Sequence, residues 1–256
     1  MGDVGSRATT TDRVLGGRVT LRQPAEGYRA AIDPVFLAAA VAEDCRGPVV
    51  DLGCGAGAAT LCVAARLPGC HLIGFERDAD MAALARENVT ANGVGEGVSI
   101  VTGDIRSTPI PAGGAAEVIA NPPFLDAARA DAVANPVKAA ATVEADAALG
   151  DWVSTALRIV RPKGAVTFVH RADRLDALLA SLRDGAGEIV VVPLWPKQGA
   201  SAKRVIVRAR RGVATPLRLT AGLVLHEPDG AYTAAANHVL RDAGSLWRAL
   251  EFKSGA

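Results

Sequence analysis

Short apolar stretches alternate with segments of helical periodicity between residues 48 and 120 of this chain. The apolar stretches predict four strands, at 48–52, 71–75, 98–102 and 116–120. The first two intervening segments predict helices at 58–67 and 78–92. Because strands that alternate with helices form parallel sheets covered by those helices, the pattern indicates an α/β fold with a doubly wound, mostly parallel sheet.

The helix at 78–92 has the clearest pattern. Its apolar positions recur every three or four residues, at Met81, Leu84, Ala85 and Val89. Asp78 stands where an N-cap is expected, and Gly93 stands where a C-cap is expected. Both ends of this helix are therefore predicted from the sequence.

The alternation continues less regularly in the second half of the chain. Helices are predicted at 152–161 and 174–182, and strands at 165–170, 189–195 and 203–209. The polar, alanine-rich connection at 125–148 is longer than usual loops, which makes it a candidate substrate loop. Beyond Gly212 the pattern weakens into a tail at 217–241, within which 223–225 predict a last strand or docking segment.

The segment before residue 48 begins with a polar leader, and an alternating stretch then predicts a strand at 18–23. A helix is predicted from Asp33 to Cys45, with Asp33 as its N-cap and Pro34 at its first position. We therefore divide the chain into an N-terminal extension, residues 1–45, and a main domain, residues 46–256.

Composition and charge narrow the class of protein. The chain holds 28 basic and 27 acidic residues, so its net charge alone indicates neither a nucleic acid nor a membrane surface as partner. No apolar run approaches the roughly 18 residues of a membrane span, and a secretory signal is absent from the first residues, so we expect a soluble, cytoplasmic protein. The cysteines and histidines lack metal-ligand spacing, which favours reduced thiols and no metal site.

A glycine-rich loop follows the first strand of the main domain. Residues 51–57 read Asp-Leu-Gly-Cys-Gly-Ala-Gly, and a predicted helix begins at once. Such glycines permit tight turns and close approach of a ligand to a helix N-terminus. The loop with Ala58 also fits the dinucleotide fingerprint, and Glu76 ends the second strand where a ribose ligand is expected. The loop alone leaves NAD and S-adenosylmethionine open as cofactors.

The stretch Asn121-Pro122-Pro123-Phe124 follows the fourth strand, at the edge where open α/β sheets place their ligands. The prolines fix the backbone and remove amide donors, which leaves the Asn121 side-chain oxygen and the Pro122 carbonyl as rigid acceptors. Such acceptors suit an amino or amide nitrogen, because they direct its lone pair towards an electrophilic methyl carbon in line with its leaving group. Phe124 would stack on a planar target. This chemistry needs neither a metal nor a catalytic histidine.

Two acidic residues change the choice of cofactor, namely Asp51 before the first glycine and Asp104 after the third strand. In this spacing the chain resembles class I S-adenosylmethionine-dependent methyltransferases, which implies a seven-stranded sheet. By that resemblance the loop from Gly53 to Gly57 holds the methionine part, Glu76 accepts the ribose hydroxyls, and Asp104 accepts from the adenine amino group. The structural alternatives are that Asp104 caps a turn and that Glu76 is a solvated strand end.

The Asn-Pro-Pro-Phe stretch resembles methyltransferases that act on adenine N6, cytosine N4, guanine N2 or a protein glutamine amide. Residues 16–39, 223–227 and 232–233 are similar to the bacterial valine-tRNA adenine-N6 methyltransferase family, although Ala31 and Ile32 depart from its usual Gly-Thr or Gly-Val. This resemblance implies a tRNA substrate and a lid helix within residues 1–45. The cofactor residues that both resemblances imply are Asp33, Asp51, Gly53, Cys54, Gly55, Gly57, Glu76, Arg77, Asp104, Ile105 and Asn121.

Other functions remain open at this point. With the same cofactor they are a protein-glutamine methyltransferase, a ribosomal RNA guanine-N2 methyltransferase and a small-molecule methyltransferase. The fold also permits a non-catalytic module that binds the cofactor or RNA, and the glycine loop permits an NAD-dependent oxidoreductase. The short segment before the first strand disfavours the protein-glutamine enzymes, which usually carry a separate helical domain there.

Basic residues gather locally although the whole chain is nearly neutral. The interval 189–226 contains no acidic residue and seven basic ones, which are Lys197, Lys203, Arg204, Arg208, Arg210, Arg211 and Arg218. Alternation places three of these arginines, 204, 208 and 210, on one strand face, as a tRNA-facing stripe or as an edge guarded against aggregation. Trp195 and Tyr28 are either stacking platforms for bases or packing residues.

Overall fold

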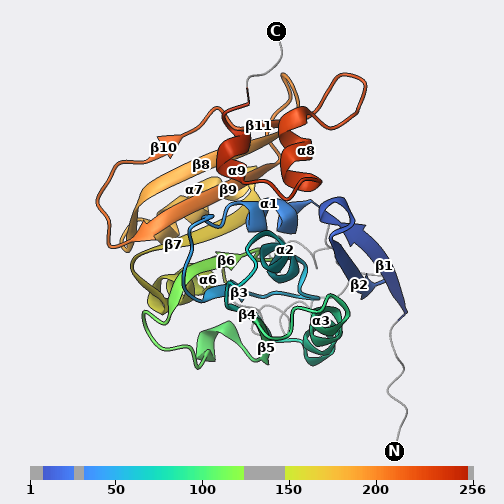
Figure 1. Ribbon diagram of the computed structural model, residues 1–256. Coiled ribbons are helices and arrows are strands. Elements are labelled where there is room, and N and C mark those ends of the chain that lie inside the picture. Colours follow the sequence, from blue (N-terminus) through green and yellow to red (C-terminus); the bar gives the residue numbers. More distant parts are fainter. Residues whose placement is uncertain (1–7, 26–31, 124–147, 253–256) are drawn as a thin grey trace, which may run out of the picture.

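The computed structural model describes residues 8–25, 32–123 and 148–252 of the chain. Within these ranges a nine-stranded sheet forms the centre of the molecule, with helices on both faces (Figure 1). The strands are β3 (Val49–Leu52), β4 (Leu72–Glu76), β5 (Val98–Thr102), β6 (Ala115–Ala120), β7 (Val160–Arg171), β8 (Ala186–Lys197), β9 (Arg204–Arg211), β10 (Arg218–Leu219) and β11 (Leu223–His226). The predicted α/β architecture is thus confirmed.

The strand order positions the ligand-binding edge. The order is β10-β8-β9-β7-β6-β3-β4-β5, and β11 also pairs with β8. The strands from β5 to β7 are mutually parallel, whereas β9 runs antiparallel to both β7 and β8. The prediction of seven strands has to be corrected to nine, because the short strands β10 and β11 extend the sheet along β8.

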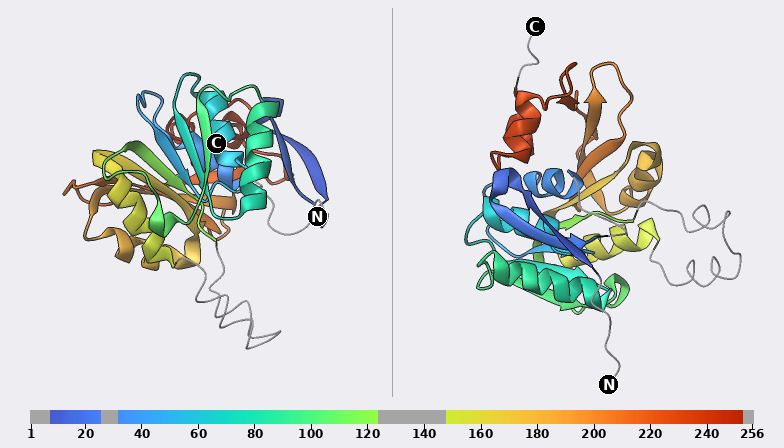
Figure 2. Two further views of the ribbon diagram at one scale, coloured as in Figure 1. Left: turned by 90° about the horizontal axis from the view of Figure 1, so that it is seen from below. Right: turned by 90° about the vertical axis from the view of Figure 1, so that its right-hand side faces the viewer.

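Helices lie on both faces of the sheet (Figures 1 and 2), and the described residues form two apolar clusters. Side chains from five helices contribute to the first, namely α1 (Asp33–Ala39), α2 (Ala58–Arg66), α3 (Ala79–Ala91), α8 (Ala234–Leu240) and α9 (Leu246–Ala249). The second contains side chains from α6 (Leu149–Ile159) and α7 (Leu175–Leu182). The predicted doubly wound arrangement follows from this division, since each face buries its own apolar positions.

Helix α3 begins and ends as its sequence predicts. The Asp78 carboxylate accepts hydrogen bonds from the amides of Asp80 (2.9 Å) and Met81 (3.1 Å), as an N-cap does. At the other end, Gly93 has a φ of +67°, the left-handed conformation that favours glycine after a helix.

Helix α1 is shorter than predicted. It spans Asp33–Ala39 rather than reaching Cys45, and its N-cap is Ile32, so Asp33 is a first-turn residue and not the cap. The amide of Val41 bonds to a carbonyl three residues back, at 3.2 Å, which tightens the last turn and directs the chain towards β3. The predicted division at residue 45 remains a prediction; the apolar residues of α1 belong to the same cluster as those of α2.

Besides the two-residue strand β10, one further strand and two helices were not predicted. The segment read as a polar leader contains β1 (Thr9–Val14), which forms an antiparallel hairpin with β2 (Val19–Pro24). The segment after residue 226 contains α8 and α9, whose caps are hydroxyl side chains of Thr233 and Ser245. Hydroxyl N-caps are a sequence signal, so both helices were open to prediction.

Helix α9 packs over the C-terminal end of α1. The indole nitrogen of Trp247 donates to the carbonyl of Ala40 at 3.0 Å, and the guanidinium of Arg248 binds the carboxylate of Glu43 at 3.1 Å. Short 3₁₀ turns complete the described parts, at Leu15–Gly17, Ile105–Ser107 and Ala172–Arg174. Among the described helices, none has the length and apolar character of a membrane span.

Candidate active site

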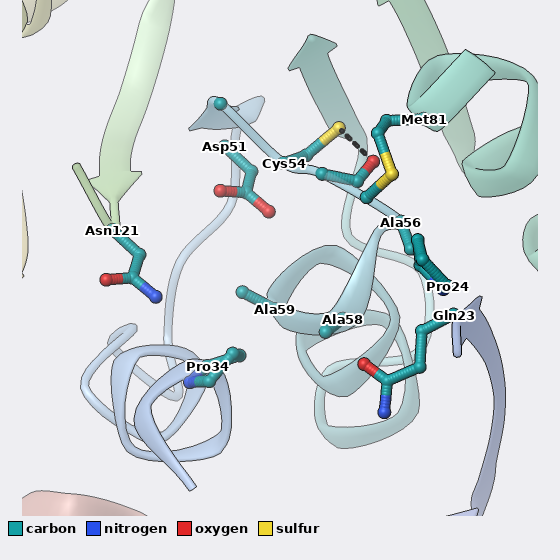
Figure 3. Close-up of a pocket in the computed structure, with 12 residues that line it drawn as sticks. Gln23, Pro24, Pro34, Asp51, Cys54, Ala56, Ala58, Ala59, Met81 and Asn121 are labelled. Atoms are coloured by element: carbon teal, nitrogen blue, oxygen red, sulfur yellow. Dashed lines mark hydrogen bonds between the residues drawn. The ribbon is translucent and has the colours of Figure 1, made fainter. Parts of the chain in front are cut away.

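A pocket opens at the carboxyl end of the parallel strands, beside the glycine loop (Figure 3). It encloses about 480 Å³ of empty space, including its mouth. The pocket is lined by Gln23 and Pro24 at the end of β2, Pro34 in α1, Met81 in α3 and Asn121 after β6, together with Asp51, 53–56, Ala58 and Ala59. Five separate segments of the chain therefore meet at the point where an open α/β sheet binds ligands.

The glycine loop owes its shape to left-handed residues. Gly53, Gly55 and Gly57 have φ values of +67°, +55° and +86°, which residues with a Cβ rarely adopt. The carbonyl of Phe75 accepts from the amides of Gly53 (2.7 Å) and Cys54 (3.1 Å), which fixes the loop to the end of β4. The sequence prediction that these glycines serve tight turning is confirmed.

We expect Gly53→Ala to lower the free energy of unfolding by about 2–3 kcal/mol, because it adds backbone strain to a steric clash. A Cβ at this position would lie 2.3 Å from the Cη2 atom of Trp152. Gly69→Ala is the matched control, since Gly69 has a φ of +88° but no atom within 4 Å of the added carbon. Urea unfolding of both variants measures the difference, and equal losses would contradict the steric contribution of Trp152.

Asp51 forms part of the pocket wall. Its carboxylate accepts hydrogen bonds from the amide of Thr60 (3.1 Å) and from the Thr60 hydroxyl (2.7 Å). The pKa of Asp51 is raised to about 7: burial is the main cause, the nearby negative charge of Glu76 adds to it, and the Thr60 bonds oppose the shift. Figure 3 shows the side chains of Asp51 and Asn121 directed towards the same space.

The carboxylate of Glu76 joins the glycine loop to the start of α3. One oxygen accepts from the amide of Gly55 (2.9 Å), and the other accepts from the amide of Asp78 (2.8 Å). Glu76 is thus not merely a solvated strand end. Its role towards a ribose remains a prediction, as does any role of the exposed Arg77 beside it.

Asp104 lies beyond β5 and has the turn-capping contact that the sequence left open as an alternative. Its carboxylate accepts from the amide of Arg106 (2.8 Å) and pairs with the Arg106 guanidinium (2.6 Å). The hydrogen bond from this guanidinium lowers the pKa of Asp104 to about 2. Ile105 is buried in the second apolar cluster. Contact of either residue with an adenine ring stays a prediction.

The tetrapeptide after β6 is described as far as Pro123. Asn121 is half-buried and lines the pocket, Pro122 is buried and Pro123 is exposed. Phe124 lies outside the described residues, as do Tyr28, Ala31 and all but the last residue of the predicted substrate loop at 125–148. The structure therefore brings Asn121 and the glycine loop to one pocket.

Within the part of the chain that the structure describes, the side chain of Asp33 contacts β9 and not the glycine loop. Its carboxylate binds the guanidinium of Arg204 at 2.9 Å, and its neighbour Pro34 lines the pocket. A role of Asp33 towards the cofactor is therefore still a prediction.

The arginine face of β9 is an internal feature of the fold. Arg208 pairs with the buried Glu117 at 2.9 Å, and Arg210 pairs with Glu188 at 3.0 Å, as Arg204 does with Asp33. The interpretation as a guarded edge is wrong, because β9 lies between β7 and β8. A contact of Lys197, Lys203 or Arg218, which are exposed, with RNA remains a prediction.

Several pocket residues escaped sequence reasoning. Gln23 is 3% exposed, and its side-chain amide donates to the Asp12 carboxylate at 2.7 Å. Gln23 and Pro24 lay in a stretch similar to a known family, which was their only signal.

Trp195 is half-buried and donates to the carbonyl of Ala221 at 2.9 Å, which fits a packing role. Within the described residues, no cluster of potential metal ligands is present.

Comparison with known proteins gives one family. The family model of the methyltransferase small domain matches residues 32–174. A search of the curated proteins finds no match.

Solved structures share the fold. A predicted O-methyltransferase from Agrobacterium tumefaciens, protein Atu636, has 24% identity and a TM-score of 0.69, with 83% of this chain and 97% of that chain covered. The tRNA (m1A58) methyltransferase TrmI from Aquifex aeolicus has 15% identity and a TM-score of 0.54, with 74% and 72% covered. A geranyl diphosphate methyltransferase in complex with S-adenosylmethionine has 18% identity and a TM-score of 0.51, with 70% and 84% covered.

These identities establish the architecture alone, whereas the family model spans more than half of the chain. The Asp51 carboxyl group lines the pocket, and the Glu76 carboxylate binds the amide of Gly55 in the left-handed glycine loop. Such acidic groups suit a cofactor that carries an ammonium and a sulfonium group. The chain belongs to the methyltransferase small-domain family of S-adenosylmethionine-dependent methyltransferases, and S-adenosylmethionine is its cofactor.

Proposed function

We propose that this protein methylates an exocyclic amino group, specifically N6 of an adenine in tRNA. The observation that carries the proposal is the position of Asn121, which enters the same pocket as the glycine loop and is followed by two prolines. A target nitrogen at Asn121 would then lie close to the cofactor site. Such a substrate also places the protein in the cytoplasm.

The residues after β6 supply acceptors for the target. The side-chain oxygen of Asn121 and the carbonyl of Pro122 would each accept one hydrogen of the amino group, so that the nitrogen lone pair points away from the ring plane. The bound cofactor supplies an electrophilic methyl group on a positively charged sulfur. Because the amino group becomes acidic once it is methylated, its extra proton passes to solvent and no strong base is required. Phe124 would stack on the target base.

We propose that the parts of the cofactor are bound by different residues at the ends of the parallel strands. We assign the methionine part to the loop from Gly53 to Gly57, the ribose hydroxyls to Glu76, and the adenine amino group to Asp104. The support for Glu76 is its place at the end of β4, where its carboxylate already accepts from two backbone amides. Its oxygens retain lone pairs for further donors.

Glu76→Ala tests the ribose assignment. We expect it to weaken binding of S-adenosylmethionine by about 10- to 100-fold, because ribose hydroxyls would be left without an acceptor and the glycine loop would lose one of its bonds. Isothermal titration calorimetry measures the affinity. The exposed Glu96→Ala serves as control and should bind as the wild type does. Unchanged affinity in Glu76→Ala would count against the assignment.

Two observations favour RNA as the substrate. The sequence resembles the tRNA adenine-N6 family at both ends of the chain, and Lys197, Lys203 and Arg218 are exposed cations in a segment without acidic residues. Exposed cations of this kind contact phosphates in nucleic-acid complexes.

Radiolabelled S-adenosylmethionine tests the substrate directly. Unmodified tRNA, ribosomal RNA and cell protein are each incubated with the enzyme, and nucleoside mass spectrometry identifies the product. We expect N6-methyladenosine in tRNA. Label as N2-methylguanosine in ribosomal RNA or as methylglutamine in protein would contradict the proposal that tRNA adenine is the substrate. Binding of the cofactor without any label would contradict the proposal that the protein methylates a macromolecule.

A further inference from the structure

The β1–β2 hairpin lies along α3 (Figure 2). Asn88 in α3 and Asn92, the C-cap of this helix, hold the hairpin there. The side-chain oxygens of Asn88 and Asn92 accept from the amides of Arg22 and Thr20, both at 2.9 Å. The side-chain nitrogens donate back to the carbonyls of the same two residues, at 2.8 and 2.7 Å. Two side-chain amides thus take the place of a neighbouring strand along the edge of β2.

Asn88 makes one more contact, which distinguishes it from Asn92. Its side-chain nitrogen also donates to the carbonyl of Ala56 at 2.9 Å, and Asn88 is fully buried. Ala56 lies within the glycine loop, between two of the left-handed glycines. The second bond donated by the side chain of Asn92 goes instead to the carbonyl of Asn88 in the last turn of α3, at 2.8 Å. A single buried amide therefore connects the hairpin to the glycine loop.

Both partners of Asn88 form pocket walls. The hairpin ends in Gln23 and Pro24, and the loop contains Ala56; all three line the pocket and lie side by side in Figure 3. Asn88 binds the backbone of both segments, at Arg22 in the hairpin and at Ala56 in the loop, and so limits the distance between these two walls. A loop that is held before the ligand arrives loses less conformational entropy when it binds.

We propose that Asn88 is a positioning residue for the cofactor, which couples the N-terminal hairpin to the glycine loop so that both walls of the pocket are held as one unit. The proposal rests on the assignment of this pocket to S-adenosylmethionine, and it is independent of the methyl acceptor. Sequence analysis placed Asn88 in a helix without a role, because its partners lie 66 and 32 residues away.

The test compares Asn88→Ala with Asn92→Ala. Both variants remove a side-chain amide that binds the edge of β2, but only Asn88→Ala releases the carbonyl of Ala56. Calorimetric titration with S-adenosylhomocysteine should show a Kd at least about tenfold higher for Asn88→Ala and within about twofold of wild type for Asn92→Ala. Thermal unfolding is measured in parallel, and we expect both variants to unfold at lower temperature.

Hydrogen exchange shows which segments open more easily in each variant, which a change in overall stability alone does not reveal. Asn88→Ala should accelerate exchange both in the hairpin and at residues 52–58, whereas Asn92→Ala should accelerate it in the hairpin alone. If Asn88→Ala does not fold, Asn88→Asp takes its place, since it keeps the acceptor for the Arg22 amide and loses both donated bonds.

Each outcome has a distinct meaning. Equal affinities of the two variants, or faster exchange confined to the hairpin in both, would overturn the role of Asn88. Failure of the wild type itself to bind S-adenosylhomocysteine would overturn the assignment of the pocket to this cofactor. Failure to methylate adenine would leave the titrations unaffected, because they contain no methyl acceptor.

Discussion

Asn121→Ala is expected to slow methyl transfer by roughly a thousandfold while cofactor affinity stays within about twofold of wild type. The alanine removes the side-chain oxygen that would accept a hydrogen of the target amino group, and the nitrogen lone pair would return to conjugation with its ring. Cofactor binding survives because the glycine loop, Asp51 and Glu76 remain in place. The loss should therefore appear in kcat rather than in the KM for the cofactor.

Asn121→Asp is the matched control. It retains an acceptor oxygen at the same position and should keep more activity than the alanine variant. Single-turnover assays with saturating S-adenosylmethionine measure the methyl-transfer step, and titration calorimetry measures binding. A parallel loss of cofactor affinity in Asn121→Ala would show that the residue serves the cofactor rather than the acceptor.

Asp51→Asn is expected to make the cofactor-free protein more stable and, at the same time, to weaken cofactor binding by about 100-fold or more. Burial raises the pKa of Asp51 from 3.8 to about 7 in the folded protein. Between these two values the folded state retains a proton that the unfolded state releases, so this residue lowers the free energy of unfolding as the pH rises. Above the folded pKa the loss is complete and constant.

The side-chain amide of the Asp51→Asn variant does not titrate, so the variant avoids this pH-dependent loss of stability. At pH 8 we expect Asp51→Asn to raise the free energy of unfolding by about 2–4 kcal/mol, because a pKa raised to about 7 corresponds to a loss of that order. Near pH 4 most of the gain should disappear. Cofactor binding falls because the positively charged ligand would lose a buried carboxylate partner.

Urea titrations at several pH values, with and without S-adenosylhomocysteine, measure both effects. The exposed Asp184→Asn serves as control for the loss of one negative charge and should change stability by less than about 0.5 kcal/mol. A variant that is less stable than wild type at pH 8 would contradict the assignment, since it would mean that the Thr60 bonds to a charged Asp51 outweigh its burial.

The central elements were predictable because their signals are local. Strand β5 spans Val98–Thr102 as predicted, and the caps of α3 lie within a few residues of the helix ends. Glycines directly after β3 and an Asn-Pro-Pro sequence directly after β6 indicate a site because parallel strands end at one edge. For the same reason the glycine loop and Asn121 were predicted to lie together.

Other features depend on partners that are remote in sequence. Strand β1 alternates between exposed and half-buried positions, and none of its residues is fully buried. Its sequence therefore needs no alternation of apolar residues, and its pairing with β2 left no signal in the hydrophobic pattern. The arginines of β9 appeared to form a basic stripe because Asp33, Glu117 and Glu188 lie 22 to 171 residues away. A count of charges along a stretch of sequence does not show which acidic residues lie beside these arginines in the fold. Gln23 and Asn88 were missed for the same reason.

The closure of α9 over α1 has a consequence for biosynthesis. The carbonyl of Ala40 receives its bond from Trp247, and α1 contributes Pro34 to the pocket. A nascent chain that has emerged only as far as β9 leaves the apolar side of α1 without the residues of α8 and α9 that share its cluster. Residues through Ala249 must therefore leave the ribosome before α8 and α9 can cover α1. A stalled shorter chain should be a substrate for chaperones and proteases.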